Sequence, residues 1–174
     1  MPETAQQYIS RIKSFLAGQD PVTVLAATPG KLRTLVQSLP EELHRSRPEP
    51  TRWSILEQVV HLSDVEIVVG YRVRVILGAE DGIPIPAFDQ DKWQQALNYN
   101  SRQLAPTIDA FEAARANNVA LYRSLTEAQW NKYGTHSERG KETVRDVITL
   151  AGGHDLNHLS QIEKILAQTA SAAR

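Results

Sequence analysis

The sequence predicts an all-α protein: an up-down bundle of four long helices with one long crossover and an extra short N-terminal helix. Apolar residues recur at steps of three and four through most of the chain, which is the spacing of a buried helical stripe. No segment shows the sustained apolar-polar alternation that is typical of strands. Because 174 residues suffice for one domain with a proper core, residues 1–174 are expected to form a single domain whose core lies at about 29–168.

Two helices are expected in the first part of the chain. Residues 3–17 form a short amphipathic segment, and a bundle helix is predicted over residues 29–43, where Pro29 suits a first-turn position. The apolar stripe of this second helix consists of Leu32, Leu35, Val36 and Leu39. Two prolines within residues 44–53 then predict a loop.

The clearest element is a helix predicted over residues 54–77. Ser54 and Glu57 have the spacing of a capping box, in which each side chain accepts a hydrogen bond from a backbone N–H at the helix start. Gly78 follows as the expected terminator. Residues 82–89 contain two prolines and are predicted to form the crossover loop.

The remaining bundle helices are predicted over residues 101–125 and 142–168. Between them, Thr126 and Gln129 repeat the capping-box spacing and predict a short helical turn. Residues 133–143 are predicted to be a loop that leads into the last helix.

Composition excludes several classes of function. The formal net charge of −1 and the lack of a basic block disfavour nucleic-acid binding. The absence of cysteine excludes disulfides, thiolate metal ligands and a cysteine nucleophile. No apolar run approaches membrane-spanning length and the N-terminal segment is too polar for a signal peptide, so we expect a soluble, cytoplasmic protein without a membrane partner.

Two histidines stand one helical turn apart near the C-terminal end. His154 and His158 follow the apolar stripe of the predicted helix and therefore lie on its buried side. A buried imidazole needs hydrogen bonds or a metal, and a pair at this spacing forms a bidentate clamp. Asp155 stands where zinc proteases with the HExxH motif have glutamate, so that class is disfavoured.

His61 is the strongest candidate for a third metal ligand. It belongs to a polar strip on an otherwise apolar helix, and the other polar members are Glu57, Gln58 and Asp64. Facing helices that supply His61 on one side and the histidine pair on the other would form a three-nitrogen site in the bundle core. His44 and His136 are expected in loops and are weaker candidates. Core histidines that only form hydrogen bonds are the alternative.

Four segments form a recognisable combination along the chain: TRWSILEQVVHLSDVE, YRVRVIL, IPAFDQDKW and GGHDLNHLSQIEKIL. In this order they resemble the DinB-like (YfiT-related) family of metal-dependent proteins, over about residues 29–168. The first and last segments are specific when they occur together, whereas either alone is weak.

The resemblance implies a four-helix bundle of the DinB/YfiT type that forms a homodimer. It also implies a divalent metal ion, nickel or zinc, with His61, His154 and His158 as its ligands. Family members with assigned chemistry are thiol-dependent transferases and isomerases that use bacillithiol, mycothiol or glutathione. Neither the substrate nor the reaction of this chain follows from the resemblance.

We therefore expect a divalent-metal-dependent enzyme that acts on a small molecule, either a hydrolase or a thiol-dependent S-transferase or isomerase. The thiol would be a low-molecular-weight cosubstrate, and no catalytic residue is assigned. The first alternative is a non-catalytic dimeric bundle that a metal stabilises, with a stress-related role in protein interaction. The second is a metal-free bundle. A coordination position left open for water or substrate would indicate an enzyme, whereas a metal closed in by a further protein ligand would indicate a structural site.

Several residues around the expected metal are candidates for supporting roles. Asp155, Asp64 and Glu57 are candidates to accept imidazole N–H bonds, although a salt bridge or a helix cap is the commoner role of each. Arginine and amide candidates for contact with a substrate are Arg72, Arg74 and Gln161, each of which could equally be ion-paired, solvated or packed. Candidates for a pocket wall, or simply for core anchors, are Trp53, Tyr71, Phe88 and Trp93.

Overall fold

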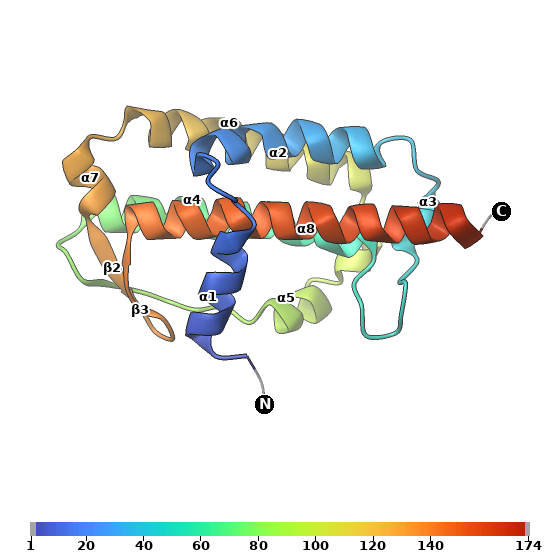
Figure 1. Ribbon diagram of the computed structural model, residues 1–174, viewed down its shortest axis with the longest axis horizontal. Helices are drawn as coiled ribbons and strands as arrows, with labels where there is room; N and C mark the ends of the chain where they lie inside the picture. The colour runs from blue at the N-terminus through green and yellow to red at the C-terminus, as the bar shows by residue number, and fades with distance from the viewer. Residues whose placement is uncertain (1–2, 173–174) are drawn as a thin grey trace.

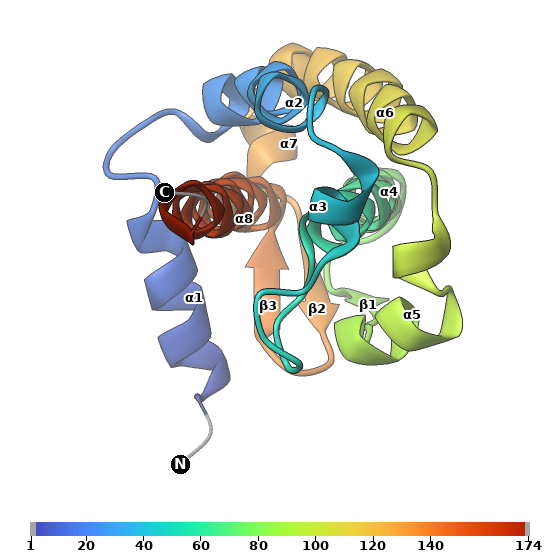
Figure 2. The ribbon, with the colours of Figure 1, turned by 90° about the vertical axis from the view of Figure 1, so that its right-hand side faces the viewer.

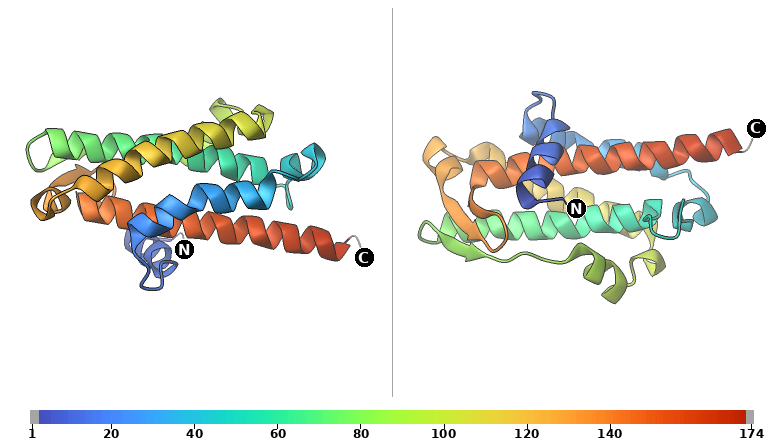
Figure 3. Two further views of the ribbon diagram at one scale, coloured as in Figure 1. Left: turned by 90° about the horizontal axis from the view of Figure 1, so that it is seen from above. Right: turned by 60° about the horizontal axis from the view of Figure 1, so that its bottom comes forward.

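Four long helices form the bundle in the computed structural model, which describes residues 3–172 (Figure 1). They are α2 (Pro21–Val36), α4 (Ile55–Gly78), α6 (Leu104–Ser124) and α8 (Val144–Ala172). Both α2 and α4 pack against α6 and α8, which closes the bundle around its core (Figure 2). The long connection between α4 and α6 makes these two helices run in the same direction (Figure 3). The predicted all-α bundle with one long crossover is confirmed.

Shorter helices occupy the ends and connections of the bundle. The extra N-terminal helix is α1 (Ala5–Ser14), which packs across α8. The others are α3 (Glu41–Arg45), α5 (Gln90–Ala96), the 3-10 turn η1 (Tyr99–Ser101) and α7 (Glu127–Asn131). Both predicted capping boxes, at Ser54 and at Thr126, are confirmed. No helix within residues 3–172 is long and apolar enough to cross a bilayer.

The second helix differs from its predicted bounds of 29–43. It begins at Pro21, after Asp20 caps it by accepting the Thr23 N–H at 2.7 Å, and it ends at Val36. Pro29 therefore lies inside the helix, where its missing N–H leaves the carbonyl four residues earlier without its usual donor. That carbonyl, of Leu25, accepts a hydrogen bond from Arg115 at 2.8 Å instead. A distant arginine thus compensates for the proline.

A small three-stranded sheet corrects the expectation that strands are absent. Its strands are β1 (Ile83–Ile85), β2 (Tyr133–His136) and β3 (Gly140–Thr143), in the order β1-β2-β3. The first pair is parallel and the second antiparallel. Both predicted loops, 82–89 and 133–143, therefore contain strands. Each strand has at most four residues, too few to show alternation, and Pro84 is tolerated because β1 is an edge strand.

A polar layer crosses the middle of the bundle and separates two apolar clusters. One cluster includes Val73, Val119 and Ile148, and the other includes Val59, Phe111 and Ile162. The polar layer between them consists of His61, Glu66, Arg115, Asn118, His154, Asp155 and His158, all of which are buried. Buried polar groups are stable only where they are hydrogen-bonded, ion-paired or bound to a ligand. This polar layer is therefore the candidate location of a functional site.

Candidate metal centre

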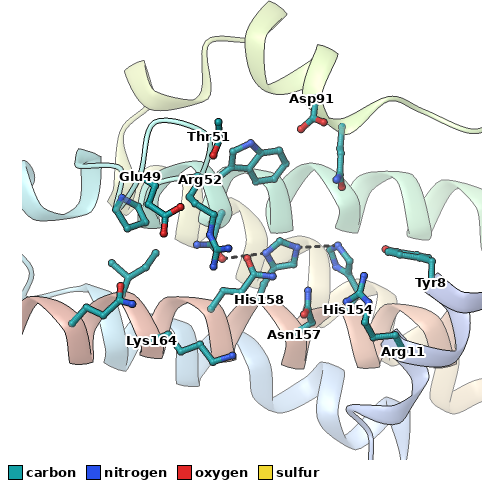
Figure 4. Close-up of a pocket in the computed structure, with 17 residues that line it drawn as sticks. Tyr8, Arg11, Glu49, Thr51, Arg52, Asp91, His154, Asn157, His158 and Lys164 are labelled. Atoms are coloured by element: carbon teal, nitrogen blue, oxygen red, sulfur yellow. Dashed lines mark hydrogen bonds between the residues drawn. The ribbon is translucent and has the colours of Figure 1, made fainter. Parts of the chain in front are cut away.

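Three histidine side chains converge in the polar layer, where α4 faces α8. Nε2 of His154 lies 3.1 Å from Nε2 of His61 and 3.2 Å from Nε2 of His158. The three ligand atoms lie within 4.8 Å of one another, and no other His, Asp or Glu among residues 3–172 joins them. Figure 4 shows His154 and His158 side by side on α8. The structure thus brings all three predicted ligands together.

Burial keeps these imidazoles neutral. Their residues are only 1% (His61), 8% (His154) and 7% (His158) exposed. Loss of hydration lowers the pKa of His154 to about 4. Loss of hydration, followed by the charge of neighbouring histidines, holds the pKa values of His61 and His158 well below the ordinary value. A neutral imidazole keeps a free lone pair, which is the form that binds a metal.

Hydrogen bonding alone leaves the cluster unsatisfied. Nδ1 of His158 lies 3.2 Å from Oε1 of Gln58, so its N–H is donated there and its Nε2 carries a lone pair. Nδ1 of His61 and of His154 is buried without a hydrogen-bond partner in the described part of the chain. Because a neutral imidazole has one N–H, Nε2 of His154 can donate to at most one of its two neighbours. The nitrogen lone pairs of the three imidazoles that face one another in this buried space therefore outnumber the N–H groups that could donate to them.

The spacing of the ring nitrogens fits a small divalent ion. Imidazole nitrogens bind zinc at about 2.0–2.1 Å, so two of them lie about 3.3 Å apart on a tetrahedral ion and about 2.9 Å apart on an octahedral one. The two separations from Nε2 of His154, 3.1 Å to His61 and 3.2 Å to His158, fall between these values. Imidazole suits both zinc and nickel, so the donor set fits a divalent metal without selecting between them.

Trp53 and Gln58 hold the imidazoles in place. The Trp53 ring stacks on His158 with centroids 6.5 Å apart and meets the edge of His61 at 4.9 Å. The Gln58 amide oxygen accepts the Nδ1 proton of His158 and thereby orients the ring. Sequence reasoning missed the role of Gln58, although its place in the polar strip three residues before His61 was an available signal.

Comparison with known proteins places the chain in a family. Residues 25–162 match the family model of the DinB superfamily. The chain belongs to the DinB superfamily. The resemblance identified from the four sequence segments is therefore confirmed.

Several proteins that are similar to this chain have names that describe an inferred metal-dependent activity. A protein of Oceanobacillus iheyensis, named as an inferred metal-dependent hydrolase, is 27% identical over 132 residues, which cover 76% of this chain and 75% of the relative. A Geobacillus kaustophilus protein of the same inferred class is 24% identical over 156 residues, with 88% and 87% covered. YfiT from Bacillus subtilis, described as an inferred metal-dependent hydrolase with an unusual four-helix bundle topology, shares the fold with a TM-score of 0.80 at 19% identity, over 86% of each chain.

The three carboxylates proposed as imidazole acceptors have other partners in this DinB protein. Asp155 forms an ion pair with Arg115 at 2.6 Å, and Asp64 accepts the Tyr99 hydroxyl at 2.6 Å. Glu57 closes the capping box at the start of α4. The salt-bridge and capping alternatives therefore hold for Asp155 and Glu57, whereas Asp64 forms a neutral hydrogen bond with a tyrosine instead. The imidazoles are oriented by Trp53 and Gln58.

Other candidates lie at or away from the cluster. His44 lies in α3 and His136 in β2, rather than in loops as predicted, and neither joins the three histidines. Tyr71 is 60% exposed on α4. Arg74 donates to Gly70 O and to Asn118 Oδ1.

Two cavities reach the histidines. One, of about 500 Å³, is bordered by Trp53, Gln161, His154 and His158 (Figure 4). The other, of about 470 Å³, is bordered by Phe88, Arg72, His61 and His154. Because His154 borders both, the buried cluster is open to a small molecule from either cavity.

Proposed function

We propose that this DinB protein is a divalent-metal-dependent enzyme that acts on a small molecule, with His61, His154 and His158 as the metal ligands. The main support for this proposal is that three neutral imidazoles bring their ring nitrogens together beside two cavities. A divalent ion held there would supply a Lewis acid that lowers the pKa of a water or thiol nucleophile. Three protein ligands without a fourth favour an open site over a closed structural one.

The surrounding residues support this role. Gln58 accepts the Nδ1 proton of His158 and so directs the lone pair of Nε2 into the site. Trp53 packs on two of the three imidazoles and limits their rotation. Arg115 pairs with Asp155 next to His154 and thereby sets the position of α8 relative to α4.

The nucleophile decides which reaction class applies. With water the protein is a hydrolase, the class that the names of its relatives infer for those proteins. With a thiol it is a transferase or isomerase, and the thiol must come from a low-molecular-weight cosubstrate because the chain contains no cysteine. The expected homodimer remains part of this proposal, and light scattering in solution measures it.

Metal content is the direct test. We expect purified, untagged protein to bind about one equivalent of nickel or zinc, and His61→Ala, His154→Ala and His158→Ala each to lose it, because two imidazoles alone make a weak site. His44→Ala and His136→Ala serve as matched controls, since both residues are buried but lie outside the cluster. Elemental analysis gives the stoichiometry, and circular dichroism verifies the fold. A folded wild-type protein that takes up no divalent metal when supplied with it would overturn the proposal.

A second measurement separates an enzyme from a metal-stabilised structural bundle. Cobalt(II) bound in place of the native ion reports its ligands through its visible spectrum. We expect the spectrum to change when a small thiol is added, because three protein ligands leave a position to be filled. A spectrum that is indifferent to thiol and to pH indicates a closed site and favours the non-catalytic alternative.

A further inference from the structure

One wall of the second cavity is a single face of α4. His61, Val65, Val69 and Arg72 border this cavity, and their spacing of four, four and three residues places them on one side of the helix. Val147, Leu150 and Ala151 of α8 form an apolar wall of the same cavity. We call this space the α4 cavity. It begins at the histidines, continues along valine and leucine side chains, and ends at an arginine.

Arg72 is a buried cation without a carboxylate partner. Its residue is 6% exposed, and none of the ion pairs among residues 3–172 includes it. One Nη2 bond goes to the carbonyl of Pro86 at 2.6 Å, while Nε is buried without a partner. Loss of hydration, and then the nearby Arg139, lowers the pKa of Arg72 to about 10, so the side chain stays charged at neutral pH. Burying such a charge costs free energy unless a counter-charge or a bound ligand compensates for the lost hydration.

The neighbouring His136 supplies no negative charge to this arginine. The backbone N–H of Glu138 lies 3.2 Å from Nδ1 of His136, and Nη2 of Arg72 lies 3.3 Å from its Nε2. Burial lowers the pKa of His136 and keeps the ring neutral. A neutral imidazole has one lone pair, so it accepts from only one of these two donors, and neither choice provides a counter-charge for Arg72.

Arg139 borders the cavity too, but it is already paired. Its guanidinium donates to both carboxylate oxygens of Glu142, at 2.5 and 3.0 Å. The other two charged residues that border the cavity are Glu138, which is exposed, and Glu3, which is already ion-paired. Of the positively charged side chains that border the α4 cavity, Arg72 is therefore the one whose charge is available to a ligand.

We propose that Arg72 binds the anionic end of the substrate, so that the α4 cavity takes a small amphipathic organic acid whose apolar body lies along Val65, Val69 and Leu150. A carboxylate and a phosphate share the required chemistry, because a guanidinium donates to either through a planar pair of N–H groups. This inference rests on the proposed function only in placing the reacting group at the histidines. Arg72 is a specificity-determining residue in this arrangement.

Calorimetric titration with simple probes tests the proposal without measuring activity. Octanoate, octyl phosphate and neutral octanol are titrated into the protein in its metal-free and metal-loaded forms. We expect wild-type protein to prefer the two anions over octanol, and Arg72→Gln to weaken anion binding by about 10- to 100-fold while leaving octanol binding unchanged. Arg72→Lys should lie between them, since it keeps the charge but loses the planar fork.

Arg74→Gln is the matched control, because Arg74 lies two residues along α4 and contacts Asn118 instead of bordering the cavity. The tighter of the two anions assigns the head group. Equal affinity of wild type and Arg72→Gln for both anions, or no preference of wild type over octanol, overturns the inference even if the protein holds its metal. Loss of metal binding with Arg72-dependent anion binding intact overturns the metal site alone.

Discussion

Arg115→Met is expected to destabilise the protein by about 3–5 kcal/mol, because it leaves buried carboxylates without their counter-charge. Arg115 on α6 pairs with Glu66 on α4 and Asp155 on α8, both at 2.6 Å, and also donates to Leu25 O on α2. One side chain thus contacts all four long helices. Urea unfolding, followed by circular dichroism, measures the loss in the free energy of unfolding.

Arg33→Met is the matched control for this substitution. Arg33 on α2 also pairs with two carboxylates of a neighbouring helix, Asp109 and Glu112, but it lies at the surface. Its loss should cost less than about 1 kcal/mol, since exposed ion pairs contribute little. Adding Glu66→Gln and Asp155→Asn to Arg115→Met should recover part of the stability by removing the unpaired charges. Similar losses for the two arginine variants would show that the buried network is not a main contributor.

The Arg115→Met variant should also respond to pH in a characteristic way. Burial raises the pKa of Glu66, and the Arg115 charge together with the Asn118 and Arg115 hydrogen bonds opposes this effect. Without the guanidinium the pKa in the folded state rises further, while the unfolded value stays ordinary. Protonation then favours the folded state, so the variant should gain stability as the pH falls from 7 towards about 4.5, the ordinary glutamate range. A flat stability profile over this range would contradict the explanation.

Gly153→Ala is expected to displace α1 from the bundle. A Cβ atom at position 153 of α8 would lie 2.2 Å from the carbonyl oxygen of Ile12, which belongs to the backbone of α1. Because that backbone cannot rotate away, the helix must shift, at a cost of about 1–3 kcal/mol. Tyr8 and Arg11 of α1 border the first cavity, so the shift should loosen one side of the candidate site as well. Hydrogen exchange along α1 and the melting temperature measure both effects.

Gly30→Ala provides the control for Gly153→Ala. Gly30 also lies within a helix, but an added Cβ meets nothing within 4 Å. This substitution should therefore stabilise the protein by about 0.5–1 kcal/mol, as glycine is a poor helix former. Increased exchange confined to α1 in Gly153→Ala, with metal content retained, is the expected pattern. Unchanged protection of α1 would show that its packing on α8 is not required.

Local signals predicted several elements well. The capping box at Ser54 marked the start of α4 correctly, because that signal depends only on residues three apart. The start of α2 was missed because Pro29 indicated a first turn, whereas Arg115 of a different helix makes proline acceptable inside α2. The pairing of β1 with β2 was missed for a similar reason, since it spans about 50 residues of intervening chain and leaves no local pattern. The hairpin of β2 and β3 is local, but its strands of four residues are too short to show alternation.

Periodicity alone identified His61, His154 and His158 and placed them on the buried faces of two helices, because a buried stripe is encoded by residue spacing within one element. Only the tertiary structure decided that their Nε2 atoms meet within 4.8 Å, that Gln58 orients one of them, and that Arg72 ends the neighbouring cavity without a carboxylate. The physical reason is that these features depend on how far each helix is translated and rotated against its neighbours. In this protein the hydrogen bonds of Arg115 on α6 join that helix to α2, α4 and α8 in the observed arrangement.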